Sequence, residues 1–219
     1  RWGRAVYLNI QRFILFQLTI SVAALGTSFA GPFLGVKIPF TVTQILWINL
    51  IMDTFAALAL ATEPPHAGIM KKKPRSPEEF IVSRPMARQL FGTAAFFLAV
   101  FIGALYAIRY DGVATPREQS LFFTGFVLLQ FWNLFNARCF GLTHSALSGL
   151  GRNPAFLLIA GTILGGQVLV TQVGGSVFRT VPLSLADWAA LMAATSVLLW
   201  AGEVRRFFAR RGRGGRSPE

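Results

Sequence analysis

The sequence is poor in charged residues. Only 14% of its 219 residues are Asp, Glu, Lys or Arg, whereas soluble domains carry about 25%. Hydrophobic residues make up 53% of the chain, and the mean hydropathy is +0.53. This balance excludes an ordinary soluble domain and favours a membrane protein. The single cysteine, Cys139, also excludes a disulfide bond within the chain.

No stretch alternates between polar and apolar residues with a period of two, which argues against a transmembrane β-barrel. Six runs are instead apolar for roughly 20 residues, the length that crosses a bilayer as a helix. They cover approximately residues 8–30, 42–62, 88–109, 119–137, 155–174 and 185–203. We therefore predict an all-α polytopic membrane protein with six transmembrane helices. A single helix over residues 5–30 would be about 39 Å long, so its excess over the ~30 Å hydrocarbon core is expected to form a cytoplasmic stalk.

The basic residues are unevenly divided among the segments that connect these runs. Six spans place both termini on one side of the membrane, and 17 of the 21 Lys and Arg residues fall on that side. The other four are Lys37, Arg109, Arg117 and Arg179. Because cytoplasmic loops carry such an excess, both termini are predicted to be cytoplasmic. The net charge of +12 then lies beside anionic membrane lipids, and no nucleic-acid partner is expected.

Asp53 is the only one of the nine acidic residues that lies deep inside an apolar run. A carboxylate at this depth costs about 3 kcal/mol or more, so it normally faces a partner or an ion. Asn49 lies four residues earlier and therefore on the same helix face. Carboxylate and amide oxygens suit Ca²⁺, which accepts six to eight oxygen ligands. The pair is thus a candidate for part of a Ca²⁺ site, and the alternative is that it only hydrogen-bonds a neighbouring helix.

Other polar and small residues lie inside the spans. Gln130, Asn133 and Asn136 form one polar face, for which hydrogen bonding between helices is the favoured interpretation. Within that face, Gln130 is the best candidate for a role in the ion pathway, and Ser21 of the first span offers a further hydroxyl oxygen. The spacing of Gly161 and Gly165 predicts close packing between helices.

The segment from Gln44 to Pro65, with its core Trp47-Ile-Asn-Leu-Ile-Met-Asp53, resembles the sixth membrane helix of P-type calcium-transporting ATPases. It looks most like the plasma-membrane (calmodulin-regulated) branch, and Gly3–Tyr7 and Arg152-Asn-Pro154 resemble other segments of that family. The resemblance implies that the six spans are the fifth to tenth helices of such a pump.

In that family, the positions matching Asn49 and Asp53 ligate the transported Ca²⁺ in the single retained site. The other ligands there come from the fourth helix, which this chain lacks. Gln130 and Ala24 fall where two-ion pumps have glutamates, which implies one Ca²⁺ per cycle. Ser21 stands where the family usually has an asparagine, so Mn²⁺ or another divalent cation stays open.

The family's Asp-Lys-Thr-Gly phosphorylation motif is absent from the sequence. The chain alone is therefore not expected to hydrolyse ATP, and ATP and Mg²⁺ would act only through upstream domains. The expected partners are the upstream catalytic and membrane portion of the same pump and the membrane lipids. The first residue is Arg1 rather than Met, which suggests a fragment or partial gene product.

We expect two regions in the chain. Residues 1–204 would form the six-span membrane domain, with the stalk on its first helix, and residues 205–219 a basic, disordered cytoplasmic tail. The tail is short, so we interpret it as a membrane anchor rather than a calmodulin-binding segment.

Two other functions compete with the transport portion of an ATP-driven pump. A self-standing channel or secondary transporter for a divalent cation predicts a complete site and an internal repeat, and we find neither. A structural membrane domain without transport leaves the cost of burying Asp53 unexplained.

Overall fold

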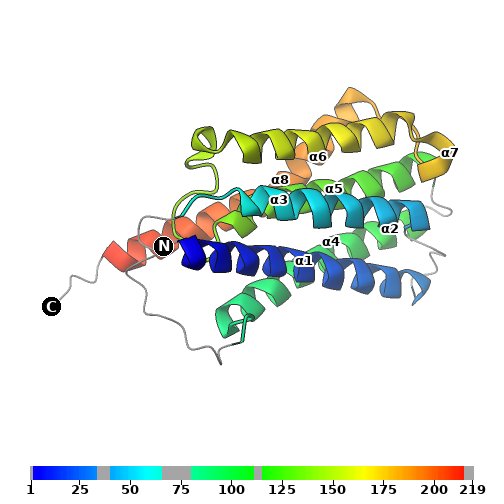
Figure 1. Cartoon of the computed structure of the whole chain (residues 1–219). Coiled ribbons are helices and arrows are strands. Elements are labelled where there is room, and N and C mark those ends of the chain that lie inside the picture. The colour runs from blue at the N-terminus through cyan, green and yellow to red at the C-terminus, as the bar shows by residue number, and fades with distance from the viewer. Residues whose placement is uncertain (1, 34–39, 66–79, 111–114, 215–219) are drawn as a thin grey trace.

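The structure is a computed structural model that describes residues 2–33, 40–65, 80–110 and 115–214 (Figure 1). These residues form helices and contain no strand, which confirms the predicted all-α class. The helices are α1 (Trp2–Phe33), α2 (Val42–Asn49), the π-helix η1 (Leu50–Phe55), α3 (Ala56–Ala61), α4 (Arg84–Tyr110), α5 (Pro116–Arg138), the 3₁₀-helix η3 (Leu150–Arg152), α6 (Pro154–Val173), α7 (Gly175–Phe178) and α8 (Leu185–Gly214).

Five of the described helices, namely α1, α4, α5, α6 and α8, are long and apolar enough to cross a membrane. The predicted count of six transmembrane helices is therefore not exact. The second predicted span is helical from Val42 to Ala61, but it divides into α2, η1 and α3. None of these three pieces is long enough to cross a bilayer by itself.

Local sequence signals start three of the helices. Thr41 accepts a hydrogen bond from the Gln44 backbone at 3.2 Å, and the Gln44 side chain accepts one from the Thr41 backbone at 2.9 Å. This reciprocal capping box opens α2, and Thr115 forms the same motif at α5. Asn153 caps α6, and Pro154 follows at the first helical position, which tolerates a residue without an N–H group.

The chain runs up and down the bundle, as contacts between the helix ends show. Asn9, near the start of α1, donates a hydrogen bond to the Glu63 carbonyl just after α3. Arg138 ends α5 and pairs with the Glu63 carboxylate, and Arg206, late in α8, donates to Asn136 of α5. We call this the basic end of the bundle.

The other end, which we call the opposite end, holds the starts of α2, α5 and α8. Gln44 of α2 donates to the Phe178 carbonyl at 2.8 Å, and Arg117 of α5 pairs with Asp187 of α8. Both contacts join segments that are far apart in the sequence. The two defined ends together establish the antiparallel order of the helices.

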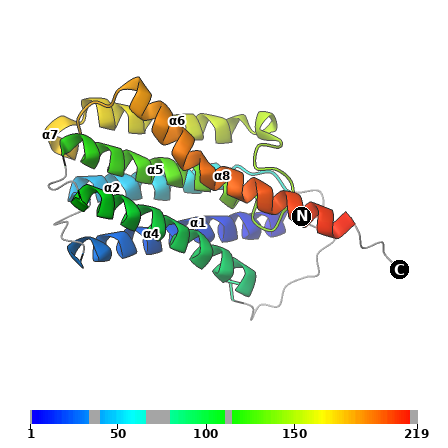
Figure 2. The same cartoon turned by 180° about the vertical axis from the view of Figure 1, so that it is seen from behind.

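Helix α5 lies at the centre of the bundle and packs against α1, α3, α4, α6 and α8. Every residue from Phe122 to Phe131 is buried. Aromatic side chains fill the space beside it, because the Phe101 ring of α4 lies 5.2 Å from the Phe122 ring and 5.0 Å from the Phe126 ring. Seen from behind, α8 passes across the end of α5, and α4 passes in front of α1 (Figure 2).

Close contacts between helices occur at glycines other than the predicted ones. A Cβ added at Gly161 or Gly165 would meet no atom within 4 Å, so the prediction of close packing there is wrong within the described chain. A Cβ at Gly26 of α1 would instead overlap the Leu98 side chain of α4. One at Gly202 of α8 would overlap Asn136 of α5.

The first and last helices are longer than their apolar runs. Helix α1 has 32 residues, or about 48 Å at 1.5 Å per residue, and continues through Pro32. Helix α8 continues to Gly214, beyond the predicted domain boundary at residue 204. The predicted disordered tail is therefore helical up to that residue, and residues 215–219 lie outside the described part.

Candidate cation-binding site

The predicted Asn49/Asp53 pair lies where the helix changes type. Asn49 is the last residue of α2, and the backbone of Asp53 lies within the π-helix Leu50–Phe55. A π-helix replaces the i→i+4 hydrogen bonds of an α-helix with i→i+5 bonds, and short π segments occur often at functional sites. The run contains no Gly or Pro that could have predicted this change. The Asp53 side chain lies outside what the structure describes.

Among the side chains that the structure describes, no hydrogen bond joins one predicted site residue to another. Asn49 is exposed and Ser21 of α1 is half-buried. Among the described hydrogen bonds, none links Ser21, Asn49 or Gln130 to another of the three. The described residues also contain no group of three or more His, Cys, Asp and Glu side chains that could hold a metal. A cation held here would thus rely on amide, hydroxyl and backbone oxygens beside Asp53.

Gln130 places a polar side chain in the core. Its side chain is fully buried on α5, and among the described residues neither its Oε1 nor its Nε2 atom has a hydrogen-bond partner. Buried amides are normally paired, so an unpaired one requires an explanation. Asn136, six residues later, is paired: its Nδ2 atom donates to the Leu198 carbonyl at 2.8 Å. The interpretation as an interhelical hydrogen bond therefore holds for Asn136 but not for Gln130.

At the opposite end, hydrogen bonds hold α2 in place. The Thr43 hydroxyl donates to the Val177 carbonyl at 2.8 Å, beside the contact between Gln44 and Phe178. One turn further along, Trp47 Nε1 donates to Gln167 Oε1 of α6 at 3.0 Å.

Gln167 is itself fully buried, and its Nε2 atom donates to the Thr171 hydroxyl at 3.1 Å. Sequence reasoning missed Gln167, because a single polar residue in an apolar run does not reveal its partner.

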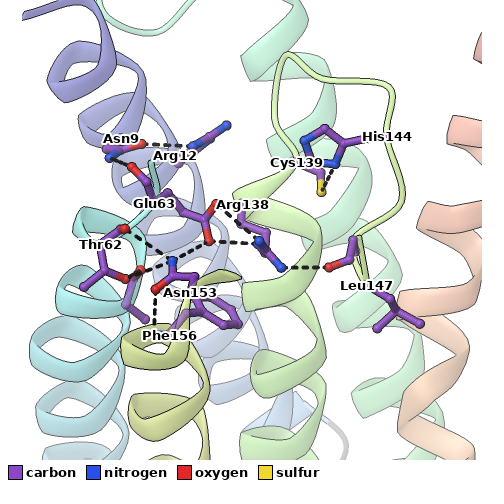
Figure 3. A network of polar contacts seen from close by, with 12 residues as sticks. Asn9, Arg12, Thr62, Glu63, Arg138, Cys139, His144, Leu147, Asn153 and Phe156 are labelled. Carbon is purple, nitrogen blue, oxygen red and sulfur yellow. Dashed lines mark hydrogen bonds and ion pairs between the residues drawn. The ribbon is translucent and has the colours of Figure 1, made fainter. Parts of the chain in front are cut away.

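At the basic end, side chains of three other helices hold the end of α3 (Figure 3). We call this cluster the basic-end junction. It consists of Asn9 of α1, Thr62 and Glu63 after α3, Arg138 at the end of α5 and Asn153 at the start of α6.

Asn9 Nδ2 donates to the Glu63 carbonyl at 3.1 Å, and Asn9 Oδ1 accepts a hydrogen bond from Arg12 at 2.9 Å. Asn153 Nδ2 lies 3.2 Å from both the Thr62 carbonyl and Glu63 Oε1.

The centre of the junction is a buried ion pair. Arg138 Nη2 donates a hydrogen bond to Glu63 Oε2 at 3.3 Å. Arg138 Nε lies 2.9 Å from Glu63 Oε1, where it forms an ion pair but no hydrogen bond. Arg138 Nη1 donates to the Ala146 carbonyl at 3.0 Å, and the guanidinium lies 4.8 Å from the centre of the Phe156 ring.

Cys139 follows α5, and burial raises the pKa of its thiol, an effect that the nearby positive charges of Arg206 and Arg138 oppose. Sequence reasoning gave Glu63 and Arg138 no role, since 75 residues separate them.

A second buried arginine supports α8 at the same end. Arg206 Nη2 lies 2.8 Å from Glu203 Oε1 and donates to Asn136 Oδ1 at 2.9 Å. The Glu203 carboxylate in turn accepts a hydrogen bond from the Ala146 backbone at 2.6 Å. These contacts bind the last helix to α5 and to the segment that follows α5.

Comparisons with known proteins agree on one class of relatives, the cation-transporting ATPases. Residues 37–208 match the family described as "Cation transporting ATPase, C-terminus". The chain is 36% identical over 211 residues to plasma membrane calcium-transporting ATPase 3 of Homo sapiens, covering 91% of this chain and 17% of that protein. It is 38% identical over 198 residues to calcium-transporting ATPase 7, plasma membrane-type, of Oryza sativa subsp. japonica, covering 90% of this chain and 19% of that protein. The chain thus spans less than a fifth of the length of these curated relatives.

Proposed function

The chain belongs to the family of cation-transporting ATPase C-termini and is an integral, multi-pass membrane protein, and from this premise we propose that it is the ion-transport portion of an ATP-driven pump that exports Ca²⁺ from the cytoplasm. The names of its relatives support Ca²⁺ as the transported ion. ATP and Mg²⁺ would act on the upstream portion of the same pump. That portion is the proposed main partner of this chain.

Asn49 and Asp53 would supply part of one Ca²⁺ site inside the membrane. The observation that carries this proposal is the π-helix Leu50–Phe55, which contains the only acidic residue of the run from Val42 to Ala61. The changed hydrogen bonding alters which backbone carbonyls lie near Asp53, and carbonyl oxygens are favourable Ca²⁺ ligands. Asn49 is exposed and directly precedes this segment, so its amide oxygen is accessible.

Gln130 and Ser21 would contribute to the ion pathway. The buried, unpaired amide of Gln130 supports this role, because an ion or a water molecule passing nearby would satisfy it. Ser21 is half-buried on α1, between the core residues Ile20 and Ala23. A hydroxyl and a neutral amide ligate Ca²⁺ more weakly than a carboxylate, which suits a pathway better than a binding site.

The basic end would face the cytoplasm. The side chains of Arg12, Arg138 and Arg206 lie there, and the positive-inside rule places such an excess on the cytoplasmic side. Both termini of the chain would then be cytoplasmic, and exposed basic residues would lie beside anionic lipids.

The experiment that tests the proposal replaces the carboxylate. Asp53→Asn in the complete pump should abolish Ca²⁺-dependent phosphorylation from ATP and leave the protein folded, because the amide keeps the side-chain shape but loses the charge that holds the ion. Asp187→Asn at the opposite end is the matched control and should leave phosphorylation unchanged. Formation of phosphoenzyme by Asp53→Asn at ordinary Ca²⁺ concentrations would show that the site lies elsewhere.

A further inference from the structure

We propose that Glu63 and Arg138 are positioning residues for the cation-binding segment: their buried ion pair fixes the basic end of α3, so that adjustment to the ion is confined to η1. This inference rests on the proposed Ca²⁺ transport. It assigns a role in transport to a junction that lies outside the candidate site.

The first argument is that the Glu63 carboxylate is already occupied. It is the next acidic residue along the chain after Asp53 and follows the end of α3, so it invites interpretation as a second ion ligand. However, its side chain is 8% exposed, and both carboxylate oxygens contact Arg138. Asn153 approaches the same carboxylate at 3.2 Å. A carboxylate neutralised in this way holds helices together rather than attracting a cation.

The second argument concerns the backbone at the end of α3. The last carbonyls of a helix have no partner within the helix itself. The carbonyls that directly follow α3 are bound by side chains of two other helices, because Asn9 donates to the Glu63 carbonyl and Asn153 to the Thr62 carbonyl. Asn9 also lies 3.4 Å from the Ala61 carbonyl. The end of α3 is therefore attached to α1 and α6 through its backbone and to α5 through Glu63.

The third argument is that the other end of the same run is also attached. Gln44 and Trp47 hydrogen-bond to Phe178 and Gln167, which fixes α2 against α6 and the segment after it. The π-helix Leu50–Phe55 lies between these two attachments. A segment fixed at both ends can accommodate an ion only by rearranging between them. Loosening the basic-end attachment would therefore misplace the ligands.

The test measures Ca²⁺ activation separately from the maximum rate. In the complete pump, Glu63→Gln should raise the Ca²⁺ concentration for half-maximal phosphoenzyme formation by about tenfold, since a ligand misplaced by about 1 Å can cost up to about a hundredfold. Phosphoenzyme at saturating Ca²⁺ should stay near the wild-type amount. Asp187→Asn makes the same chemical change in the exposed ion pair and should leave the activation constant unchanged.

A double variant tests whether the two charges act as a pair. Arg138→Gln alone leaves the Glu63 carboxylate buried without its partner, whereas Glu63→Gln/Arg138→Gln removes both charges. The double variant should recover part of the Ca²⁺ affinity that Arg138→Gln loses. If the activation constant of the double variant shifts by the product of the two single-variant shifts, the two charges act independently, and this would overturn the pairing.

A milder variant keeps the inference testable if Glu63→Gln fails to fold. Asn153→Ser retains an N-cap for α6 but removes the amide that reaches Glu63 and Thr62. It should shift the activation constant in the same direction by a smaller factor. An unchanged activation constant in Asn153→Ser, or a Glu63→Gln variant that loses only its maximum phosphoenzyme, would overturn the positioning role.

The wild-type pump separates this inference from the proposed function. Absence of Ca²⁺-dependent phosphoenzyme in the wild type would reject the proposed function and the inference that rests on it. Normal wild-type dependence together with an unshifted Glu63→Gln would reject the positioning role alone.

Discussion

The two ends of the bundle contain the same kind of ion pair in different surroundings. At the basic end, the Arg138 and Glu63 side chains are 4% and 8% exposed. At the opposite end, Arg117 is 63% exposed and its partner Asp187 is 11% exposed. Water and salt compete for an exposed pair, whereas breaking a buried pair leaves a charge without compensation. The comparison indicates that burial, rather than the presence of an ion pair, decides which end of the bundle is fixed by charge.

The hydrogen bonds at the two ends differ as well. The basic end combines its ion pair with hydrogen bonds from Asn9 and Asn153 to backbone carbonyls. The opposite end depends instead on neutral hydrogen bonds, such as those from Thr43 and Gln44 to the segment after α6. Three variants, in order of decreasing expected effect, test this contrast.

Removing the buried guanidinium should have the largest effect on stability. Arg138→Gln should lower the free energy of unfolding by about 3–5 kcal/mol, because the Glu63 carboxylate stays buried without a counter-charge. The melting temperature of the purified complete pump in detergent measures the loss. The double variant Glu63→Gln/Arg138→Gln is the control and should melt at a higher temperature than Arg138→Gln. Equal melting temperatures of these two variants would contradict the role of the unpaired charge.

Filling the contact at Gly202 should have an intermediate effect. A Cβ there would overlap Asn136 Oδ1, which accepts the hydrogen bond from Arg206, so either the Asn136 amide must give up its hydrogen bonds or α8 must move away from α5. We expect Gly202→Ala to cost about 1–3 kcal/mol, measured by the same melting experiment. Gly161→Ala is the matched control, because a Cβ at that helical position meets nothing within 4 Å. A larger loss in Gly161→Ala than in Gly202→Ala would contradict the assigned contact.

Removing the exposed guanidinium should have the smallest effect. Arg117→Gln should leave the melting temperature nearly unchanged, because solvent already screens its pairing with Asp187. Asp187 also accepts hydrogen bonds from Ser184 at the start of α8, and this variant leaves those bonds intact. A loss as large as that of Arg138→Gln would show that exposure does not separate the two ends.

Much of the fold could be predicted because a bilayer constrains the sequence strongly. Apolar runs of about 20 residues and the capping residues at Thr115 and Asn153 placed most helices to within a few residues. Helix α8 is the exception at its C-terminal end. Residues 205–214 include five arginines, and in the structure they continue α8 beyond the apolar run.

The site was predictable only in part. The cost of burying a carboxylate indicated Asp53, and its spacing indicated Asn49. The π-helix around Asp53 had no such signal, because the same residue types form α-helix on either side. Asn136 has a hydrogen-bond partner and Gln130 has none among the described residues, and this difference depends on which helices face α5.

The sequence by itself determined that the chain is a helical membrane protein, where its spans lie and which carboxylate is unusual, because these properties follow from local hydropathy and from the cost of charge in lipid. Only the tertiary structure decided that Glu63 meets Arg138 and that Gly202, rather than Gly161, is a point of close approach. Such contacts join residues far apart in the chain, and their energies depend on burial. Burial arises only after the helices have packed.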